Sequence, residues 1–218
     1  TLKKIEKIAR EAYVAQEEIL KNITEALKNE KIFLKNEYEL SDEQLKYVWD
    51  YYNRSIADEI TPYILNDNSK IFSQLRDAHI YFLVKMGNAS KQQKIQYALL
   101  EMPVYGFERF VVLPDSDGEK QLIFIDDIVR LFLPQIFGNF DFDTFDAYSF
   151  KITRDSEMEI ESEMDKGFME KISKGVKSRR FGLPLRFIYD RQMPGDMRQY
   201  ILKKIEFKKS SSIVATGR

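Results

Sequence analysis

The sequence contains no cysteine and only one histidine, His79. Without cysteine the chain has no disulfide and no thiolate nucleophile or ligand. A single histidine gives poor support for a transition-metal site, because such sites usually draw on several His or Cys side chains. His79 opens an apolar, strand-like segment, and we predict that it is a structural residue with a local hydrogen bond rather than a base or nucleophile.

Several sequence patterns are also missing. No apolar run approaches the roughly 20 residues that span a bilayer, so we expect no transmembrane segment. No basic-then-apolar leader opens the chain, which favours a cytoplasmic location. The phosphate-binding motifs G-x-x-x-x-G-K-[ST] and G-x-G-x-x-G are absent, as is the G-x-S-x-G turn of serine hydrolases. With 34 Lys and Arg against 35 Asp and Glu, the overall charge identifies no partner.

The first part of the chain has helical patterning. Residues 2–28 carry apolar side chains at three- or four-residue steps, which places them on one stripe of an amphipathic helix: Ile5, Ile8, Ala12, Ala15, Ile19, Ile23 and Ala26. A capping box at 41–44 opens a second helix with Leu45, Val48, Trp49, Tyr52 and Ile56 on one face. Thr61-Pro62 ends it, because proline disfavours helix in the residue before it.

After residue 78 the apolar pattern has a period of two, typical of strands. The predicted strands are His79–Met86, Ile95–Met102, Arg109–Leu113, Gln121–Ile125, Tyr148–Thr153 and Leu185–Tyr189. Asp126 is expected to cap a short helix, and further helices are predicted over 160–176 and 195–204. These elements predict an α+β fold: an N-terminal antiparallel helical pair, then a mainly antiparallel sheet with packed helices. We place a helical segment at 1–60 and an α+β domain at 61–218.

Carboxylates gather at Asp141, Asp143 and Asp146, and again over 155–165. Paired acids can bind a hard cation such as magnesium. Turn geometry explains the first group equally well, and the second favours the positive end of the following helix. We therefore predict no metal site here.

Positive charge gathers toward the end of the chain. From residue 171 onward only Asp190, Asp196 and Glu206 oppose a basic set: Lys171, Lys174, Lys177, Arg179, Arg180, Arg186, Arg191, Arg198, Lys203, Lys204, Lys208, Lys209 and Arg218. Such an excess attracts polyanions, although a solvated surface explains it equally. Aromatic residues do not alternate with the basic ones as in single-strand binders, so nucleic acid is not expected as a partner.

Several stretches resemble the middle, or head, domain of bacterial polyphosphate kinase of the first type. They are IFLKNEYELSDEQLKYVWDYYNRSIADEITPYILND, RFVVLP, IFIDDIVRLFLPQIFGNFDFDTFDAYSFKITRDSEMEI and LRFIYDRQMP, in the same order as in that family. SSIVATGR resembles the link into the catalytic half. The strongest motifs are AYSFKITRD and DRQMP, whereas Asn66-Asp67-Asn68 departs from the family's usual proline-containing turn.

This resemblance implies a parent enzyme that transfers the terminal phosphate of ATP to polyphosphate, with magnesium and a phosphorylated histidine. It places the nucleophile in C-terminal domains and the adenine contact in an upstream helical domain. His79 does not stand in the nucleophile's motif, so we expect no catalytic residue and no cofactor in this chain. The chain starts at Thr1, and we expect it to be a segment of that longer enzyme.

The resemblance also implies partners: the other domains of the same chain, a second subunit of a homodimer, and polyphosphate near the parent's tunnel. Within AYSFKITRDSEMEI, Arg154 is the predicted phosphate contact, since guanidinium groups match oxyanions. Arg154 could equally pair with the acidic residues that follow it. Two rival functions stay open, namely a free-standing protein-interaction module and a polyanion-binding module.

Overall fold

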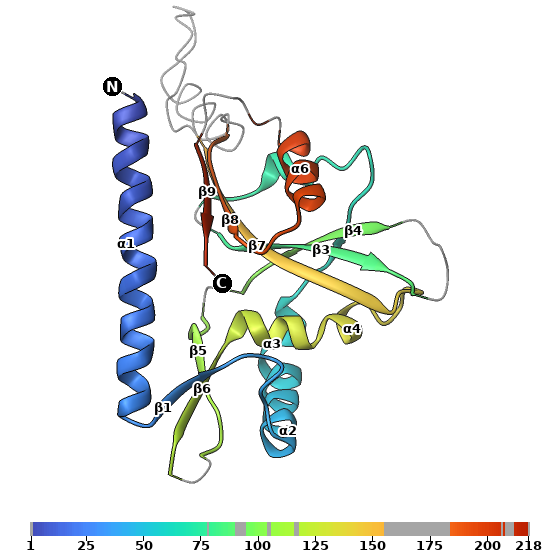
Figure 1. Ribbon diagram of the computed structural model, residues 1–218. Helices are drawn as coiled ribbons and strands as arrows, with labels where there is room; N and C mark the ends of the chain where they lie inside the picture. The colour runs from blue at the N-terminus through green and yellow to red at the C-terminus, as the bar shows by residue number, and fades with distance from the viewer. Residues whose placement is uncertain are drawn as a thin grey trace, which may run out of the picture. The chain divides into compact units, whose positions relative to one another are not determined.

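The computed structural model describes residues 2–77, 79–89, 95–103, 106–115, 118–154, 184–205, 207 and 212–217. Helices and mixed, mostly antiparallel sheets confirm the predicted α+β class (Figure 1). The chain divides into two compact units: unit 1 is Thr1–Ile64 with Phe82–Ala147, and unit 2 is Leu65–Tyr81 with Tyr148–Arg218. The boundary placed between residues 60 and 61 from the sequence stays a prediction.

Unit 1 begins with the predicted long helix, α1, at Leu2–Asn29. Its apolar stripe is present but uncovered, because Ile5, Ile8, Ile19 and Ile23 keep between 51% and 58% of their surface exposed. The helix was predictable from the helix propensity of its residues and from the spacing of its apolar side chains. An apolar stripe of this kind usually packs against another element, and no described residue buries these four isoleucines.

The chain leaves α1 through Lys31, whose φ of 58° lies in the left-handed region. Backbone bonds fix this conformation, because the Lys31 amide donates to the Lys28 carbonyl at 3.0 Å and the Lys120 amide donates to the Lys31 carbonyl at 2.9 Å. Left-handed backbone is unfavourable for any residue with a Cβ, and glycine is the usual residue just after a helix.

Replacing Lys31 by glycine is therefore expected to raise the free energy of unfolding by about 0.5–1 kcal/mol. Urea denaturation followed through the fluorescence of Trp49, the single tryptophan, would measure it. Lys35→Gly, in strand β1, is the control and should lower stability by a similar amount. Equal losses in both variants would contradict the prediction.

The predicted capping box opens helix α2, Asp42–Tyr51. The Gln44 amide donates to Ser41 Oγ at 3.3 Å, and the Ser41 amide donates to Gln44 Oε1 at 3.2 Å. The helix continues as a π-turn at Tyr52–Ile56 and a 3₁₀ turn at Ala57–Glu59, and ends before Thr61-Pro62 as predicted.

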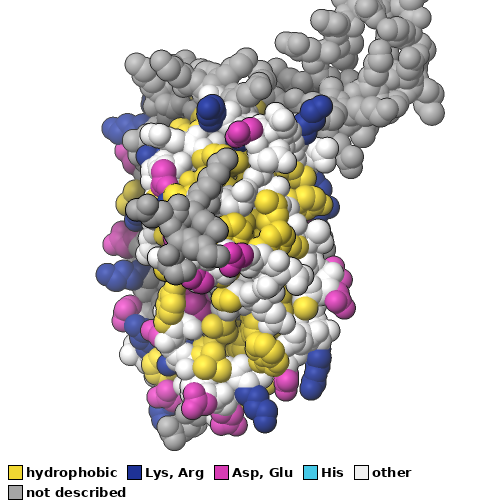
Figure 2. Space-filling view, turned by 90° about the vertical axis from the view of Figure 1, so that its right-hand side faces the viewer, with side chains coloured by type: hydrophobic (Ala, Val, Ile, Leu, Met, Phe, Trp, Pro, Cys, Tyr) yellow, Lys and Arg dark blue, Asp and Glu magenta, His cyan; other side chains and the backbone are white. Residues whose placement is uncertain are grey.

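The buried face of this helical run is narrower than predicted. Val48, Tyr52 and Ile56 are buried at four-residue spacing, whereas Leu45 and Trp49 are 36% and 52% exposed. Tyr52 stacks on Phe132, with ring centroids 4.1 Å apart. Figure 2 shows that hydrophobic side chains reach the surface in several separate patches on the face it presents.

A three-stranded sheet in unit 1 has the order β1-β6-β5. Strands β5, Phe110–Val112, and β6, Lys120–Phe124, form the predicted antiparallel hairpin. Strand β1, Ile32–Lys35, lies parallel to β6, with Ile32 opposite Lys120. This four-residue run was not predicted to be a strand, and its role as a strand depends on a partner far along the chain.

Strand β6 leads directly into helix α3, Ile125–Leu131, which is followed by α4, Leu133–Ile136. The prediction that Asp126 caps this helix is wrong. The N-cap is Phe124, and Asp126 lies in the first turn, where it forms an ion pair with Arg109.

The other strands of unit 1 follow the order β2-β4-β3. They are β2 at Tyr63–Ile64, β4 at Gln96–Glu101 and β3, which begins at the last residue of unit 2 and runs over Tyr81–Gly87. The predicted strands over 79–86 and 95–102 are thus confirmed. β2 is antiparallel to β4. Four successive residues of β3 from Tyr81 are buried, as in a strand covered on both faces.

Unit 2 contains strands in the order β7-β8-β9, a 3₁₀ turn η3 at Ile71–Gln74 and helix α6 at Gly195–Lys204. β7, Thr144–Arg154, starts in unit 1 and pairs antiparallel with β8, Pro184–Asp190. β9, Ser212–Thr216, is parallel to β8 and was not predicted. The predicted helix over 160–176 lies outside the described residues.

One face of these three strands forms the core of unit 2. Phe150, Ile152 and Phe187 are each at most 1% exposed. The Tyr81 ring lies 5.7 Å from that of Phe150, and Met197 of α6 is fully buried. Tyr81 therefore contributes an aromatic contact to this face, and helix α6 contributes a fully buried side chain to the unit.

Candidate functional site

Arg154, the predicted phosphate contact, is the last residue of β7. It is 7% exposed and follows an irregularity in the β7–β8 register between Thr153 and Arg154. Its Nη2 donates to the Phe72 carbonyl at 2.6 Å, and its backbone amide donates to Asp77 Oδ1 at 3.1 Å. Both acceptors belong to the segment 71–77 of the same unit, so Arg154 fixes the end of β7 to that segment.

Burial lowers the pKa of the Arg154 guanidinium, while the Asp77 carboxylate and the Tyr81 phenol act in the opposite direction. Burying the cation costs free energy, which these groups and the Phe72 carbonyl offset. The acidic residues that follow Arg154 lie outside the described residues. The phosphate contact of Arg154 therefore stays a prediction.

His79 lies in the same segment of unit 2. It is 6% exposed, and its Nδ1 is 2.9 Å from the Asp77 carbonyl oxygen. Its ring is 6.5 Å from that of Tyr81. This is the geometry of a histidine bonded to its own loop, as predicted from the sequence.

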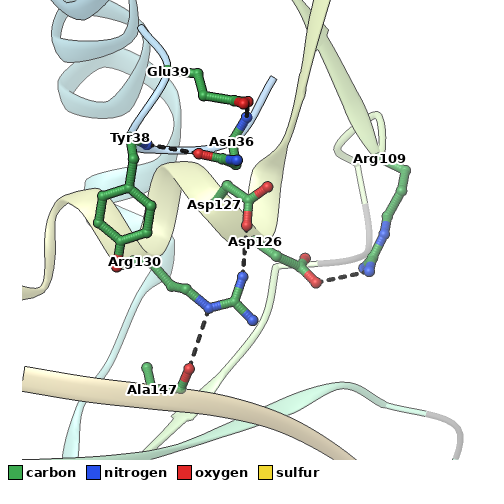
Figure 3. Close-up of polar contacts among 8 residues, drawn as sticks. All are labelled: Asn36, Tyr38, Glu39, Arg109, Asp126, Asp127, Arg130 and Ala147. Carbon is green, nitrogen blue, oxygen red and sulfur yellow. Dashed lines mark hydrogen bonds and ion pairs between the residues drawn. The ribbon is translucent and has the colours of Figure 1, made fainter. Parts of the chain in front are cut away.

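A second polar cluster, in unit 1, was missed from the sequence (Figure 3). The Arg130 Nη1 atom is 2.6 Å from Asp127 Oδ1, and both side chains are 8% exposed. Arg130 Nε also donates to the Ala147 carbonyl at 3.2 Å, and its guanidinium lies 4.6 Å from the centre of the Phe82 ring. Arg130 thus connects α3 to the start of β7 and to β3.

Asp126, one residue earlier, points to a different arginine (Figure 3). Its Oδ2 accepts from Arg109 Nη2 at 2.7 Å, and the Arg109 side chain is 40% exposed. Arg109 also lies 5.6 Å from the centre of the Phe124 ring. The Asp-Asp-x-x-Arg spacing on a helix was a readable signal for the Asp127–Arg130 pair, whereas the Arg109–Asp126 pair joins different elements.

The predicted acidic group at Asp141, Asp143 and Asp146 is exposed. Asp143 Oδ1 accepts from the Ala89 backbone amide at 2.8 Å, a bond between segments that lie far apart in the sequence. Across the part of the chain that the structure describes, no three His, Cys, Asp or Glu side chains gather closely enough to hold a metal ion. The residues 155–165 fall outside that part.

Of the basic residues predicted from position 171 onward, the structure describes five: Arg186, Arg191, Arg198, Lys203 and Lys204. Arg198 donates to Tyr189 Oη at 2.9 Å. Lys204 donates to the carbonyls of Asn66 at 3.3 Å and Asp67 at 2.8 Å, so it holds the loop in which the sequence departs from the family pattern. Arg198 and Lys204 therefore bond to different parts of unit 2, and these contacts do not bring the two cations together at one site.

Membrane insertion through a helix has no support in the described residues, because none of their helices is long and apolar enough to cross a bilayer. The polar sites described above are two clusters, each centred on a buried arginine. Arg130 with Asp127 forms the one in unit 1, and Arg154 with the Phe72 carbonyl forms the one in unit 2.

Comparison with known proteins places the chain in a family. The family model described as "Polyphosphate kinase middle domain" matches residues 43–217. The polyphosphate kinases of Vibrio cholerae and Escherichia coli K12 are each 36% identical over 191 residues, covering 86% of this chain and 27% of the relative. The crystal structure of polyphosphate kinase from Porphyromonas gingivalis has the same fold, with a TM-score of 0.73 at 23% identity, covering 99% of this chain and 30% of that one.

The chain spans less than a third of the length of these relatives, and α1 and β1 lie before the part that the family model matches. The described part of that match holds both arginine clusters and the strands that carry them. This chain therefore belongs to the polyphosphate kinase family, in which it corresponds to the middle domain.

Proposed function

We propose that this chain is the non-catalytic middle domain of an enzyme that transfers the terminal phosphate of ATP to polyphosphate. One observation carries the proposal: the middle-domain match extends over 43–217, while the chain spans only 27% of the Vibrio cholerae polyphosphate kinase. ATP, magnesium and the reactive groups then belong to other segments of a parent protein, which we place in the cytoplasm.

The described polar groups support the proposal that the reactive groups lie in other segments of the parent enzyme. His79, Arg130 and Arg154 are all engaged in contacts within their own units. Phosphoryl transfer depends mainly on positioning and charge stabilisation. A domain that helps to position the catalytic segments therefore affects the rate without supplying a reacting group.

We further propose that the domain packs against other parts of the parent enzyme and against a second subunit, and that it helps to support a tunnel for polyphosphate. Apolar side chains at the surface support the packing role. Phe110 and Val112 of β5 are 43% and 57% exposed, and Trp49 of α2 is 52% exposed. Exposed apolar groups of this size commonly mark interaction surfaces.

A free-standing protein-interaction module is the second candidate function, and α1 favours it. The exposed stripe of Ile5, Ile8, Ile19 and Ile23 would suit an amphipathic helical partner. The flanking coding sequence separates the two: a histidine-containing catalytic half downstream supports the kinase domain, and a stop codon soon after residue 218 supports the module.

The purified 218-residue chain, incubated with radiolabelled ATP, magnesium and polyphosphate, is expected to elongate no polyphosphate and to carry no label. The physical reason is that its one histidine is buried and bonded to its own loop. Thin-layer separation of polyphosphate and acid-sensitive labelling of the protein would measure both. A label that disappears in His79→Gln would overturn the non-catalytic assignment.

A further inference from the structure

The three-stranded sheet of unit 1 has one covered side. Val111 of β5 and Ile123 of β6 are 5% and 0% exposed. Gln121 lies on the same side as Ile123, because residues two apart in a strand point the same way. Its Oε1 accepts from Gln44 Nε2 of helix α2 at 2.6 Å. Helix α2 therefore contacts this side of the sheet.

The opposite side of the sheet is apolar and open. Directly paired residues share one side of a sheet, and the strand register gathers a set that we call the sheet face: Ile32, Leu34, Phe110, Val112, Lys120, Leu122 and Phe124. The rings of Phe110 and Phe124 lie 4.6 Å apart, as expected for such a pair. Phe110 and Val112 are 43% and 57% exposed, and none of the other five is buried. A three-stranded apolar surface thus stays uncovered by the described residues.

Helix α1 carries a second uncovered apolar surface of unit 1. Its stripe consists of exposed residues at three- or four-residue steps: Ile5, Ile8, Ala12, Ala15, Ile19, Ile23 and Ala26. The helix passes into β1 through a turn that the backbone bonds of Lys31 fix. The sheet of the same chain does not cover the stripe, because its four isoleucines keep more than half of their surface exposed.

The two surfaces match in size. An α-helix with its side chains is about 10 Å across, and three strands spaced by about 4.8 Å present a face of similar width. Strand β6, Lys120–Phe124, is about 17 Å long, which corresponds to roughly three turns of the stripe. Helices and sheets bury their apolar sides against each other in this way within domains. The sheet face can therefore hold one helix laid along its strands.

Charge also favours this pairing. Lys120 is exposed and is the only charged member of the sheet face. Glu11 and Glu18 border the middle of the stripe, because each precedes a stripe residue by one position on the helix. Neither Lys120 nor Glu18 forms an ion pair with a described residue. The acidic border of the stripe and the basic edge of the sheet face are complementary.

We propose that the sheet face binds helix α1 of a second copy of this chain, so that two copies exchange helices about a two-fold axis. The symmetry makes the contact twice and uses the stripe and the sheet face of both copies. One contact alone falls short of the roughly 20–30 residues per partner of a stable interface, whereas the reciprocal pair with its polar borders approaches that size. The inference names the surfaces for the second-subunit contact of the proposed function, on which it rests.

Sedimentation equilibrium of the 218-residue chain is expected to show a dimer. I8E/I19E in the stripe and V112E in the sheet face should each raise the Kd of dimerisation at least about tenfold, because a carboxylate would enter an apolar contact. V14E and I95E are the matched controls, since Val14 and Ile95 are 60% and 48% exposed outside these two surfaces. The controls should change the Kd less than about twofold, with the fold of every variant checked by circular dichroism.

Mixing the two defective chains tests the exchange itself. The I8E/I19E chain keeps an intact sheet face, and the V112E chain keeps an intact stripe. A mixed dimer therefore has one sound contact, whereas each variant alone has none. The mixture is expected to associate more tightly than either variant by itself.

A chain that stays monomeric at its highest soluble concentration would overturn the proposal, because another segment of the parent enzyme would then cover these surfaces. A mixture that associates no more tightly than its components would also overturn it, since helix would then pair with helix or sheet with sheet. These assays measure association alone. A monomeric chain can still be a non-catalytic middle domain, and a chain that becomes labelled by ATP can still dimerise.

Discussion

Replacing Arg130 by methionine is expected to lower the free energy of unfolding of unit 1 by about 3–5 kcal/mol. The substitution keeps an apolar stem of similar length over the Phe82 ring but removes the guanidinium that lies 2.6 Å from Asp127 Oδ1. The Asp127 carboxylate, with 8% of its side chain exposed, would then remain buried without its cation. The loss reflects that buried charge more than the value of the pair itself.

Trp49 makes this measurement specific to unit 1, because it is the single tryptophan and its ring is 5.4 Å from that of Phe132. Urea denaturation followed by its fluorescence would report the expected change. Arg54→Met is the matched control, since the Arg54 side chain is 80% exposed and 3.8 Å from Asp50. That control should leave stability nearly unchanged.

The double variant Asp127→Asn with Arg130→Met separates the two causes of the loss. Without the carboxylate there is no buried charge to neutralise, so the double variant is expected to be more stable than Arg130→Met alone. A double variant as unstable as the single one would assign the effect to lost packing and to the bond with the Ala147 carbonyl.

Much of the fold was predictable because its signals are local. The three- and four-residue apolar spacing of 2–28, the Ser41–Gln44 capping box and Thr61-Pro62 lie within one or two helical turns of the structure they specify. Alternation likewise predicted strands β3 to β6 and β8. These elements needed no knowledge of their partners.

The three missed strands have no comparable signal. β1, β2 and β9 are four, two and five residues long, and β1 and β9 are parallel to their partners, β6 and β8 respectively. A short apolar run reads equally as a connection, and a parallel partner comes from elsewhere in the chain. The predicted face of α2 was too wide for a related reason, since only tertiary contacts decide that Trp49 stays exposed while Val48 is buried.

The partners of the buried arginines were also difficult to predict from the sequence. Arg154 was predicted to be a phosphate contact because it lies at the end of a strand, whereas the acceptor that its guanidinium bonds is the main-chain carbonyl of Phe72. A carbonyl is present at every residue, so no side-chain pattern points to it.

Replacing Arg154 by methionine is expected to destabilise unit 2 by about 1–3 kcal/mol. The Phe72 carbonyl, bonded at 2.6 Å, would lose a charged donor, and the Asp77 carboxylate would lose a neighbouring cation. Amide hydrogen exchange in β7 and β8 would measure the opening free energy of this unit, which contains no tryptophan. Arg191→Met is the matched control, because Arg191 is exposed in the turn after β8.

The same variant separates the two roles considered for Arg154. If the arginine is a structural anchor, Arg154→Met accelerates exchange in β7, and Arg154→Lys recovers only part of the protection, because a single ammonium lacks the planar fork of guanidinium. If it is a phosphate contact instead, exchange stays unchanged while polyphosphate affinity falls. Since Arg154 is 7% exposed and bonded within its own unit, we expect the first result.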